Sequence, residues 1–140
     1  MISVVIDTNV IFSGLLTKKG YSHLLLKNID HPDLRLNISV PLILEYEKMF
    51  FERLSDLTLS KTDITNFLDF ICRISAHIKI HYLWRPFLKD QYDDMVLELA
   101  INCSAKYIVT YNVKDFLNIE QFGLSIIKPY ELLKKLGVIK

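Results

Sequence analysis

The sequence predicts a three-layer α/β/α fold, in which helices cover both faces of a central parallel sheet of four to five short strands. The first observation is that short β-branched runs alternate along the chain with segments of helical periodicity, a pattern typical of parallel sheets. The second observation is that nothing in the sequence suggests a domain boundary. Pro and Gly number only four each, and there is no repeat or change of composition along the chain. We therefore expect residues 1–140 to form a single domain.

Five segments fit strands. The run at residues 3–6 (SVVI) is β-branched and ends at Asp7, and the run at residues 107–110 (YIVT) is apolar enough for a buried strand. The other candidates are residues 36–40, 78–82 and 125–128.

Helical patterns fill the intervals between these strands. Pro41 suits the first turn of a helix that is expected to run to about Leu54. Residues 92–104 are apolar nearly all round, which indicates a buried helix. The remaining helices are expected at residues 9–16, 21–28 and 61–75, and from Pro129 to just before Gly137.

Composition and length exclude several classes of protein. A chain of 140 residues, 51% hydrophobic and 24% charged, is ordinary for a globular domain and not for a disordered one. The longest uncharged stretch, residues 8–17, is far shorter than the ~18 residues that suggest a transmembrane helix. The first residues lack a basic segment and meet an acid at Asp7, and two cysteines are too few for a disulfide framework. We expect a cytoplasmic protein with no membrane partner.

Net charge is nearly neutral but unevenly distributed. Seventeen Lys and Arg against sixteen Asp and Glu give +1, whereas proteins that bind nucleic acid through phosphates alone are usually more basic. A basic group lies near the C-terminus and is most simply a solvated helix end. Its members are Lys128, Lys134, Lys135 and Lys140, and an acidic cluster comprises Asp90, Asp93, Asp94 and Glu98.

Acids and amides follow the expected carboxyl ends of the strands, where open α/β sheets bind ligands. Asp7 ends the first strand, Glu45 lies one turn into the helix after the second, and Asp115 follows the strand at residues 107–110. Each has an ordinary explanation, since Asp7 could cap a helix and Glu45 could be solvated like Glu47. Glu45, however, starts only about 6 Å up its helix and stays nearer the sheet edge than Glu47. Together, the acids favour a functional site.

The buried helix at residues 92–104 adds further carboxylates. Asp93 and Asp94 could be first-turn acids favoured by the helix dipole. Asp94 and Glu98 share one face of a helix with almost no polar side, so their burial needs compensation. Asp93 is rotated by about 100° and is expected to point to solvent or to cap the helix. We therefore expect Asp94 to face the cleft.

Carboxylates brought within ~4 Å repel each other by about 4 kcal/mol at an effective dielectric constant near 20, and protons or a cation must offset this. Oxygen ligands without His or Cys favour Mg²⁺ or Mn²⁺ over zinc. His77 and His81 are four residues apart but flank a predicted strand, so they make a poor metal pair. The pattern predicts a metal-dependent enzyme that acts on phosphate groups.

Four segments together resemble the PIN domain family, and most closely its bacterial branch of toxins of toxin–antitoxin systems. Each is a weak motif alone, but the four stand in the family's order and cover nearly the whole chain. They are V-V-I-D-T-N-V at residues 4–10, S-V-P-L-I-L-E at 39–45, D-D-M-V-L-E-L-A at 93–100 and Y-I-V-T-Y-N-V-K-D-F at 107–116.

The resemblance implies a PIN-like fold and a Mg²⁺- or Mn²⁺-dependent endoribonuclease that cleaves single-stranded or structured RNA. The acids that correspond to Asp7, Glu45 and Asp94 hold the metal in that family. The resemblance also implies an antitoxin protein as partner, and frequent homodimers.

The last motif departs from the family pattern, which often has an Asp where this chain has Asn112. Asp115 matches a second acid of that pattern and is our candidate for the fourth carboxylate, although a site with three carboxylates stays open. We expect nearby polar groups to orient the acids or a water molecule. These are Thr8, Asn9, Ser39, Glu98, Thr110 and Asn112.

Two other functions fit parts of the sequence. A catalytically degenerate PIN domain that binds RNA or a protein agrees with Asn112 and with the neutral charge, but not with the retention of Asp7, Glu45 and Asp94. A receiver domain also places acids at strand ends, but it needs a Lys after the last strand, and Lys128 is followed at once by Pro129. The leading prediction is the ribonuclease, as the toxin of a pair.

Overall fold

The computed structural model describes residues 1–81, 88 and 91–140, with residues 91 and 92 described by their backbone alone. Its centre is a parallel sheet of five strands in the order β3-β2-β1-β4-β5. The predicted α/β/α class with a central parallel sheet is therefore confirmed. The strands are β1 (Ile2–Ile6), β2 (Leu34–Ile38), β3 (Ala76–His77), β4 (Tyr107–Val109) and β5 (Ser125–Ile127).

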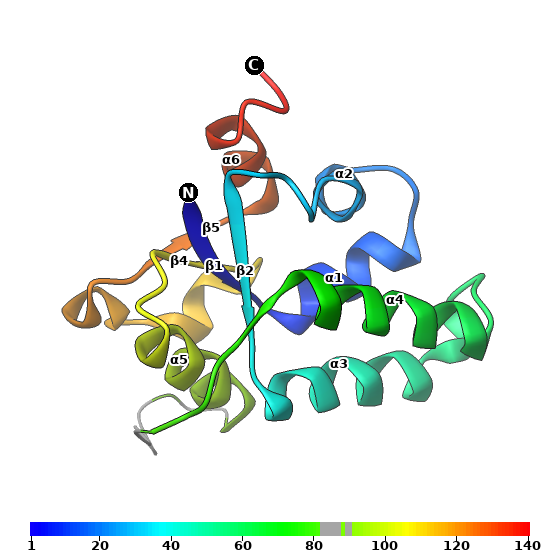
Figure 1. Ribbon diagram of the computed structural model, residues 1–140, viewed down its shortest axis with the longest axis horizontal. Helices are drawn as coiled ribbons and strands as arrows, with labels where there is room; N and C mark the ends of the chain where they lie inside the picture. Colours follow the sequence, from blue (N-terminus) through cyan, green and yellow to red (C-terminus); the bar gives the residue numbers. More distant parts are fainter. Residues whose placement is uncertain (82–87, 89–90) are drawn as a thin grey trace.

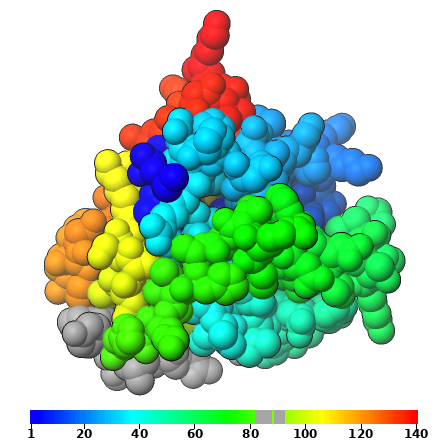
Figure 2. Space-filling view, viewed as in Figure 1, coloured from blue at the N-terminus to red at the C-terminus, as the bar shows by residue number. Residues whose placement is uncertain are grey.

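Helices flank the sheet, with α5 on one side and α1 and α2 on the other (Figure 1). Figure 2 shows α4 lying along α3 on the outside of the molecule, and the two helices are in contact. The helices are α1 (Thr8–Leu16), α2 (Tyr21–Lys27), α3 (Val40–Glu52), α4 (Lys61–Ile74), α5 (Gln91–Asn102) and α6 (Pro129–Lys135). Short 3₁₀ turns are η1 (Leu54–Asp56), η2 (Val113–Phe116) and η3 (Ile119–Phe122). No helix within the described ranges is long and apolar enough to span a membrane.

The middle strand β1 sets the position of the site. Val4, Val5 and Ile6 are fully buried and pair with residues 107–109 of β4, and Val4 also pairs with Leu36 of β2. Val109 in turn pairs with Ile127 of β5. Because these strands are parallel, the residues that follow them emerge at one edge of the sheet, beginning with Asp7.

Three strands agree with the sequence prediction to within one residue at each end, and two, β2 and β3, differ by more. The second strand occupies Leu34–Ile38 rather than residues 36–40, because Ser39 caps α3 and its Oγ accepts a hydrogen bond of 3.3 Å from the backbone N–H of Leu42. The third strand is Ala76–His77 rather than residues 78–82. It pairs with Asn37 and Ile38 at the end of β2, so sheet register rather than local pattern decides where it lies. Tyr82, the last residue of that predicted strand, lies outside the described residues.

Gly14 allows α1 and α2 to pack closely. A Cβ atom at this position would lie 2.5 Å from Cδ1 of Leu26 and 2.9 Å from the backbone oxygen of Ser22. The second contact is with backbone, which cannot move aside as a flexible side-chain end can. The missing side chain at Gly14 therefore sets how closely the start of α2 approaches α1.

Candidate active site

Asp7 is the buried centre of the site, with 8% of its surface exposed. It is the N-cap of α1, and its Oδ1 accepts a hydrogen bond of 2.8 Å from the backbone N–H of Thr8. Its Oδ2 accepts a hydrogen bond of 2.8 Å from Oγ1 of Thr110, which follows the neighbouring strand β4. Two donors from different elements therefore hold the plane of this carboxylate. The helix-cap interpretation of Asp7 is correct, and it coexists with a place in the pocket.

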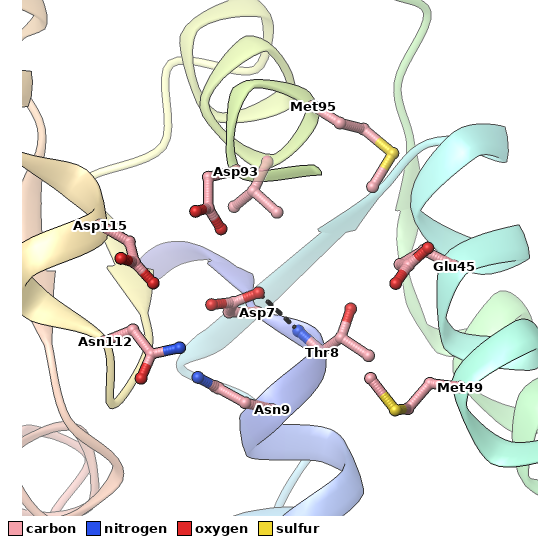
Figure 3. A pocket seen from close by; sticks show the side chains of 10 residues that line it. Asp7, Thr8, Asn9, Glu45, Met49, Asp93, Met95, Asn112 and Asp115 are labelled. Atoms are coloured by element: carbon pink, nitrogen blue, oxygen red, sulfur yellow. Dashed lines mark hydrogen bonds between the residues drawn. The ribbon is translucent and has the colours of Figure 1, made fainter. Parts of the chain in front are cut away.

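A pocket of about 170 Å³ opens in front of Asp7 at the carboxyl edge of the sheet (Figure 3). Four carboxylates and two side-chain amides line it, and no Lys, Arg or His is among its described lining residues. The lining consists of Asp7, Thr8, Asn9, Glu45, Met49, Asp93, Met95, Val96, Asn112 and Asp115. Negative charge is concentrated here although the chain as a whole is nearly neutral.

Helix α3 contributes Glu45 from the side opposite Asp115 and Asp93 (Figure 3). Glu45 lines the pocket whereas Glu47 is exposed, as their distances from the sheet edge predicted. The next residue, Tyr46, is fully buried, and its hydroxyl donates a hydrogen bond to the backbone carbonyl of Ile6. This hydrogen bond links α3, the helix that carries Glu45, to Ile6, the residue before Asp7.

Tyr46 is buried near the negative charge of Asp7. Burial raises the pKa of the Tyr46 phenol well above its usual value, and the negative charge of Asp7 raises it further. The phenol therefore remains a hydrogen-bond donor throughout the physiological pH range.

The first turn of α5 differs from the predicted orientation. Asp93 lines the pocket and points toward Asp7 and Asp115 in Figure 3, whereas Asp94 is not among the lining residues. The prediction that Asp93 points to solvent and Asp94 faces the cleft is therefore wrong. The helix is apolar nearly all round, so its pattern gave no reliable rotational phase.

Asp94 and Glu98 are instead buried inside the protein, each with 2% of its surface exposed. Oδ1 of Asp94 accepts a hydrogen bond of 2.7 Å from the backbone N–H of Leu88, which ties the chain before α5 to the helix. The predicted need for compensation is met for Asp94 in this way. Neither side chain lines the pocket.

The loop after β4 brings Asn112 and Asp115 to the opposite wall from Glu45 (Figure 3). The backbone N–H of Asn112 donates to Oγ1 of Thr110 (3.1 Å), and the backbone N–H of Asp115 donates to the carbonyl of Asn112 (3.1 Å). The 3₁₀ turn η2 therefore places both side chains in the pocket, as the three-residue spacing suggested.

The predicted site residues thus fall into two sets. Thr110 reaches the pocket through Asp7, and Ser39 caps the helix that carries Glu45. The structure brings together Asp7, Thr8, Asn9, Glu45, Asn112 and Asp115, and it places Ser39, Asp94, Glu98 and Thr110 outside the lining.

The donor set fits a hard divalent cation. Among residues 1–81, 88 and 91–140, no three His, Cys, Asp or Glu side chains are close enough to coordinate one ion directly. Mg²⁺, however, is usually held by one or two carboxylates and keeps several waters, and all polar lining atoms are oxygens or amide nitrogens. Oδ1 of Asn9 is buried and accepts no hydrogen bond from the part of the chain that the structure describes, so this wall of the pocket can take a donor such as a water molecule.

Sequence reasoning missed two residues of the site. Tyr46 is not among the predicted site residues, although a tyrosine hydroxyl on a buried helix face signals that a polar partner is needed. Asp93 is predicted to face solvent because Asp94 shares a helix face with Glu98, but in the structure it is Asp93 that lines the pocket.

An acid pocket at the carboxyl edge of a parallel α/β/α sheet defines a class of domains that bind their ligands beyond the strand ends. The family model described as "PIN domain" matches residues 3–114, and the chain belongs to the PIN domain family. No curated protein in the comparison matches it.

Two solved structures share the fold. One is VapBC2 from Rickettsia felis bound to a DNA fragment from its promoter, with 15% identity, a TM-score of 0.63, and coverage of 91% of this chain and 98% of that chain. The other is VapBC-1 from nontypeable Haemophilus influenzae, with 17% identity, a TM-score of 0.63, and coverage of 92% and 99%. At these identities the similarity establishes the fold.

Proposed function

We propose that this PIN domain is an endoribonuclease that depends on Mg²⁺ or Mn²⁺ and hydrolyses RNA phosphodiester bonds. The observation that carries the proposal is the pocket itself, in which Asp7, Glu45, Asp93 and Asp115 converge from four elements. Such a concentration of carboxylates stabilises neither the fold nor the binding of a phosphate unless a cation is present.

In this proposal the pocket acids hold the cation, and neighbouring residues orient the acids. Asp7 is kept in place by Thr8 and Thr110, and it is the innermost of the acids. Asp93 and Asp115 on one wall and Glu45 on the other would complete the cation site, in place of the set Asp7, Glu45, Asp94 and Asp115 that the sequence predicted. The bound cation supplies positive charge that polarises water and neutralises the phosphate.

The amides add donors that the acids cannot provide. Asn9 and Asn112 lie on the same side of the pocket, and Figure 3 shows their amide nitrogens pointing toward each other. A carboxamide nitrogen can donate two hydrogen bonds, so this pair can hold the oxygens of a phosphodiester.

We further propose that the protein is the cytoplasmic toxin of a toxin–antitoxin pair, neutralised by an antitoxin protein, and that it forms homodimers. The support is the family membership together with the shared fold of the two VapBC structures. The test is co-purification of the chain with the product of an adjacent small reading frame, followed by measurement of the mass of the complex.

The test of the nuclease is cleavage of total RNA by purified protein in Mn²⁺, in Mg²⁺ and in EDTA. Asp7→Asn should abolish cleavage while the protein stays folded, because Asn also caps a helix and removing one like charge relieves repulsion. Asp69→Asn, at an exposed position of α4, is the matched control and should cleave normally. Mn²⁺ should raise the melting temperature of the wild type more than that of Asp7→Asn, because binding to the folded state stabilises it.

A second function, the catalytically degenerate domain that binds RNA or a protein, is favoured by Asn112. It predicts that RNA binds but stays intact in Mn²⁺ and that the melting temperature does not respond to Mg²⁺, Mn²⁺ or Ca²⁺. Ca²⁺ separates the two functions further, since a nuclease of this type should be stabilised by Ca²⁺ and cleave little with it.

A further inference from the structure

Three exposed tyrosines gather at the same edge of the sheet as the pocket. Tyr111 and Tyr130 follow β4 and β5, whose last residues, Val109 and Ile127, pair with each other. Tyr21 opens α2, and its ring meets that of Tyr130 edge to face, with centroids 4.9 Å apart and an interplanar angle of 64°. We call Tyr21, Tyr111 and Tyr130 the tyrosine surface.

The tyrosine surface is connected to the pocket through Tyr111. This residue stands between Thr110, which donates to Asp7, and Asn112, which lines the pocket. Its hydroxyl shares a hydrogen bond with Oγ of the buried Ser22, the second residue of α2. The contact of α2 with α6 then continues the surface to Tyr130.

The three rings remain largely open to solvent in the folded chain. Tyr21, Tyr111 and Tyr130 are 48%, 41% and 40% exposed, so much of their aromatic area is available to a ligand. Aromatic rings at a nucleic-acid site stack with unpaired bases of any sequence, because every base has a π-face.

Lysines accompany the rings. The ammonium group of Lys134 lies 5.5 Å from the centre of the Tyr130 ring. Lys18 and Lys19 precede Tyr21, Lys128 precedes Tyr130, and all are exposed. Glu131 is the acid on this part of α6, and its Oε1 accepts a hydrogen bond from the backbone N–H of Lys128. Lys134 therefore lies beside a ring, and the three other lysines are close to the tyrosines in sequence, whereas four carboxylates line the pocket. This division suits a strand with both bases and phosphates.

We propose that the tyrosine surface binds unpaired bases of the RNA strand whose phosphodiester lies in the pocket. The inference rests on the proposed nuclease function and adds to it a surface that holds unpaired bases beside the cleaved bond. The lysines favour this polyanion over a protein ligand, which the aromatic rings alone could also attract. Lys128 and Lys134, two of the basic residues near the C-terminus, would thereby take part in substrate binding.

The experiment measures binding of a fluorescent single-stranded RNA oligonucleotide and of the corresponding duplex by anisotropy in Ca²⁺, which should occupy the cation site and support little cleavage. The double variant Tyr21→Leu/Tyr130→Leu should bind the single strand about tenfold more weakly and the duplex almost as well as wild type. Tyr21→Phe/Tyr130→Phe keeps the rings and should retain the affinity. Phe51→Leu removes a ring of similar exposure (37%) at the far end of α3 and is the control.

Tyr111 is tested separately because its hydroxyl contacts Ser22. Tyr111→Phe removes that hydrogen bond and keeps the ring, and Tyr111→Leu removes both. A loss of single-strand affinity in Tyr111→Leu alone supports stacking, whereas equal losses in both variants mean that the hydroxyl holds α2 in place, which contradicts stacking by Tyr111. Melting temperatures show that each variant is folded.

The outcomes separate this proposal from the nuclease function. If the double Leu variant binds single-stranded RNA as tightly as wild type, the tyrosine surface does not bind bases, even if wild type cleaves RNA in Mn²⁺. If single-strand affinity falls as expected but wild type never cleaves, the surface proposal stands and the nuclease proposal fails. If the Leu variant loses only an antitoxin protein and not RNA, the surface is a protein-docking site and the proposal is overturned.

Discussion

The hydroxyl of Thr110 donates a hydrogen bond of 2.8 Å to Oδ2 of Asp7, joining residues that are 103 positions apart in the chain. The two residues follow neighbouring parallel strands, and Thr110 also accepts from the backbone N–H of Asn112. One fully buried hydroxyl therefore orients a carboxylate and anchors the loop that carries two further pocket residues.

Replacement of this hydroxyl tests its role in positioning Asp7. Thr110→Val keeps the shape of the side chain, and we expect a loss of about 1–3 kcal/mol of stability because the buried carboxylate of Asp7 loses a donor and the backbone N–H of Asn112 loses its acceptor. RNA cleavage at saturating Mn²⁺ should fall about tenfold, since Asp7 and Asn112 lose their alignment. Thr110→Ser restores the hydroxyl and should recover most activity, and Thr62→Val on the exposed face of α4 is the control. Full activity in Thr110→Val would show that Thr8 alone orients Asp7.

The two neighbouring acids of α5 should behave differently. Asp93 lines the pocket, so Asp93→Asn should abolish cleavage and leave the melting temperature in EDTA unchanged or higher. Asp94 is buried and accepts from Leu88, so Asp94→Ala should cost about 1–3 kcal/mol of stability measured by urea unfolding. Asp94→Asn can still accept from Leu88 and should keep most activity per folded molecule. The reverse result, with Asp94→Asn inactive and Asp93→Asn active, would restore the orientation expected from the sequence.

Asp115 is expected to supply the fourth carboxylate. It lies in the pocket beside Asn112, and η2 holds both on one side. Asp115→Ala should weaken Mn²⁺ binding, measured as the Mn²⁺-dependent rise in melting temperature, and should reduce cleavage in parallel. Introducing Asn112→Asp into that variant should restore part of both, because it returns one negative charge to the same wall. If Asp115→Ala lowers only the melting temperature in EDTA, the site works with three carboxylates.

Tyr46 is expected to couple α3 to the strand that carries Asp7. Tyr46→Phe removes the hydroxyl that donates to the carbonyl of Ile6, and we expect a loss of about 1–3 kcal/mol because a buried acceptor is left unpaired. Since Glu45 precedes Tyr46, the affinity for Mn²⁺ should fall as well. The control is Tyr107→Phe on β4, which removes a hydroxyl outside this connection. Unchanged Mn²⁺ affinity in a destabilised Tyr46→Phe protein would limit Tyr46 to a structural role.

The raised pKa of Tyr46 should make the stability of the folded protein depend on pH in the alkaline range. Burial and Asp7 raise the pKa of Tyr46 in the folded protein, so the unfolded chain loses this proton first, near pH 10. A raised folded pKa gives stability that is complete below the unfolded pKa and is lost as pH rises above it. The difference in melting temperature between wild type and Tyr46→Phe should therefore shrink between about pH 9 and pH 11. A constant difference over this range would contradict the assignment.

Several features of the site followed from the sequence alone. Residues that end a parallel strand emerge at one edge whatever the details of packing, so Asp7 and Asn112 could be placed there from short apolar runs. The distance along a helix is also local information, which is why Glu45 and not Glu47 was expected near that edge. The oxygen-rich character of the pocket follows from composition at these positions.

The tertiary structure decides the rotation of helix α5 about its axis and the position of strand β3 in the sheet. Asp93 and Asp94 differ by about 100° around α5, and a helix that is apolar on nearly every side carries no local signal for which of them faces the sheet edge. Packing of α5 against β1, β2 and β4 decides it, and these contacts join parts of the chain far apart in sequence. The place of β3 is likewise set by pairing with Asn37 and Ile38, and the bond between Thr110 and Asp7 exists only once β1 and β4 lie side by side. Local pattern determines which residues reach the edge of the sheet, whereas long-range packing determines which atoms meet there.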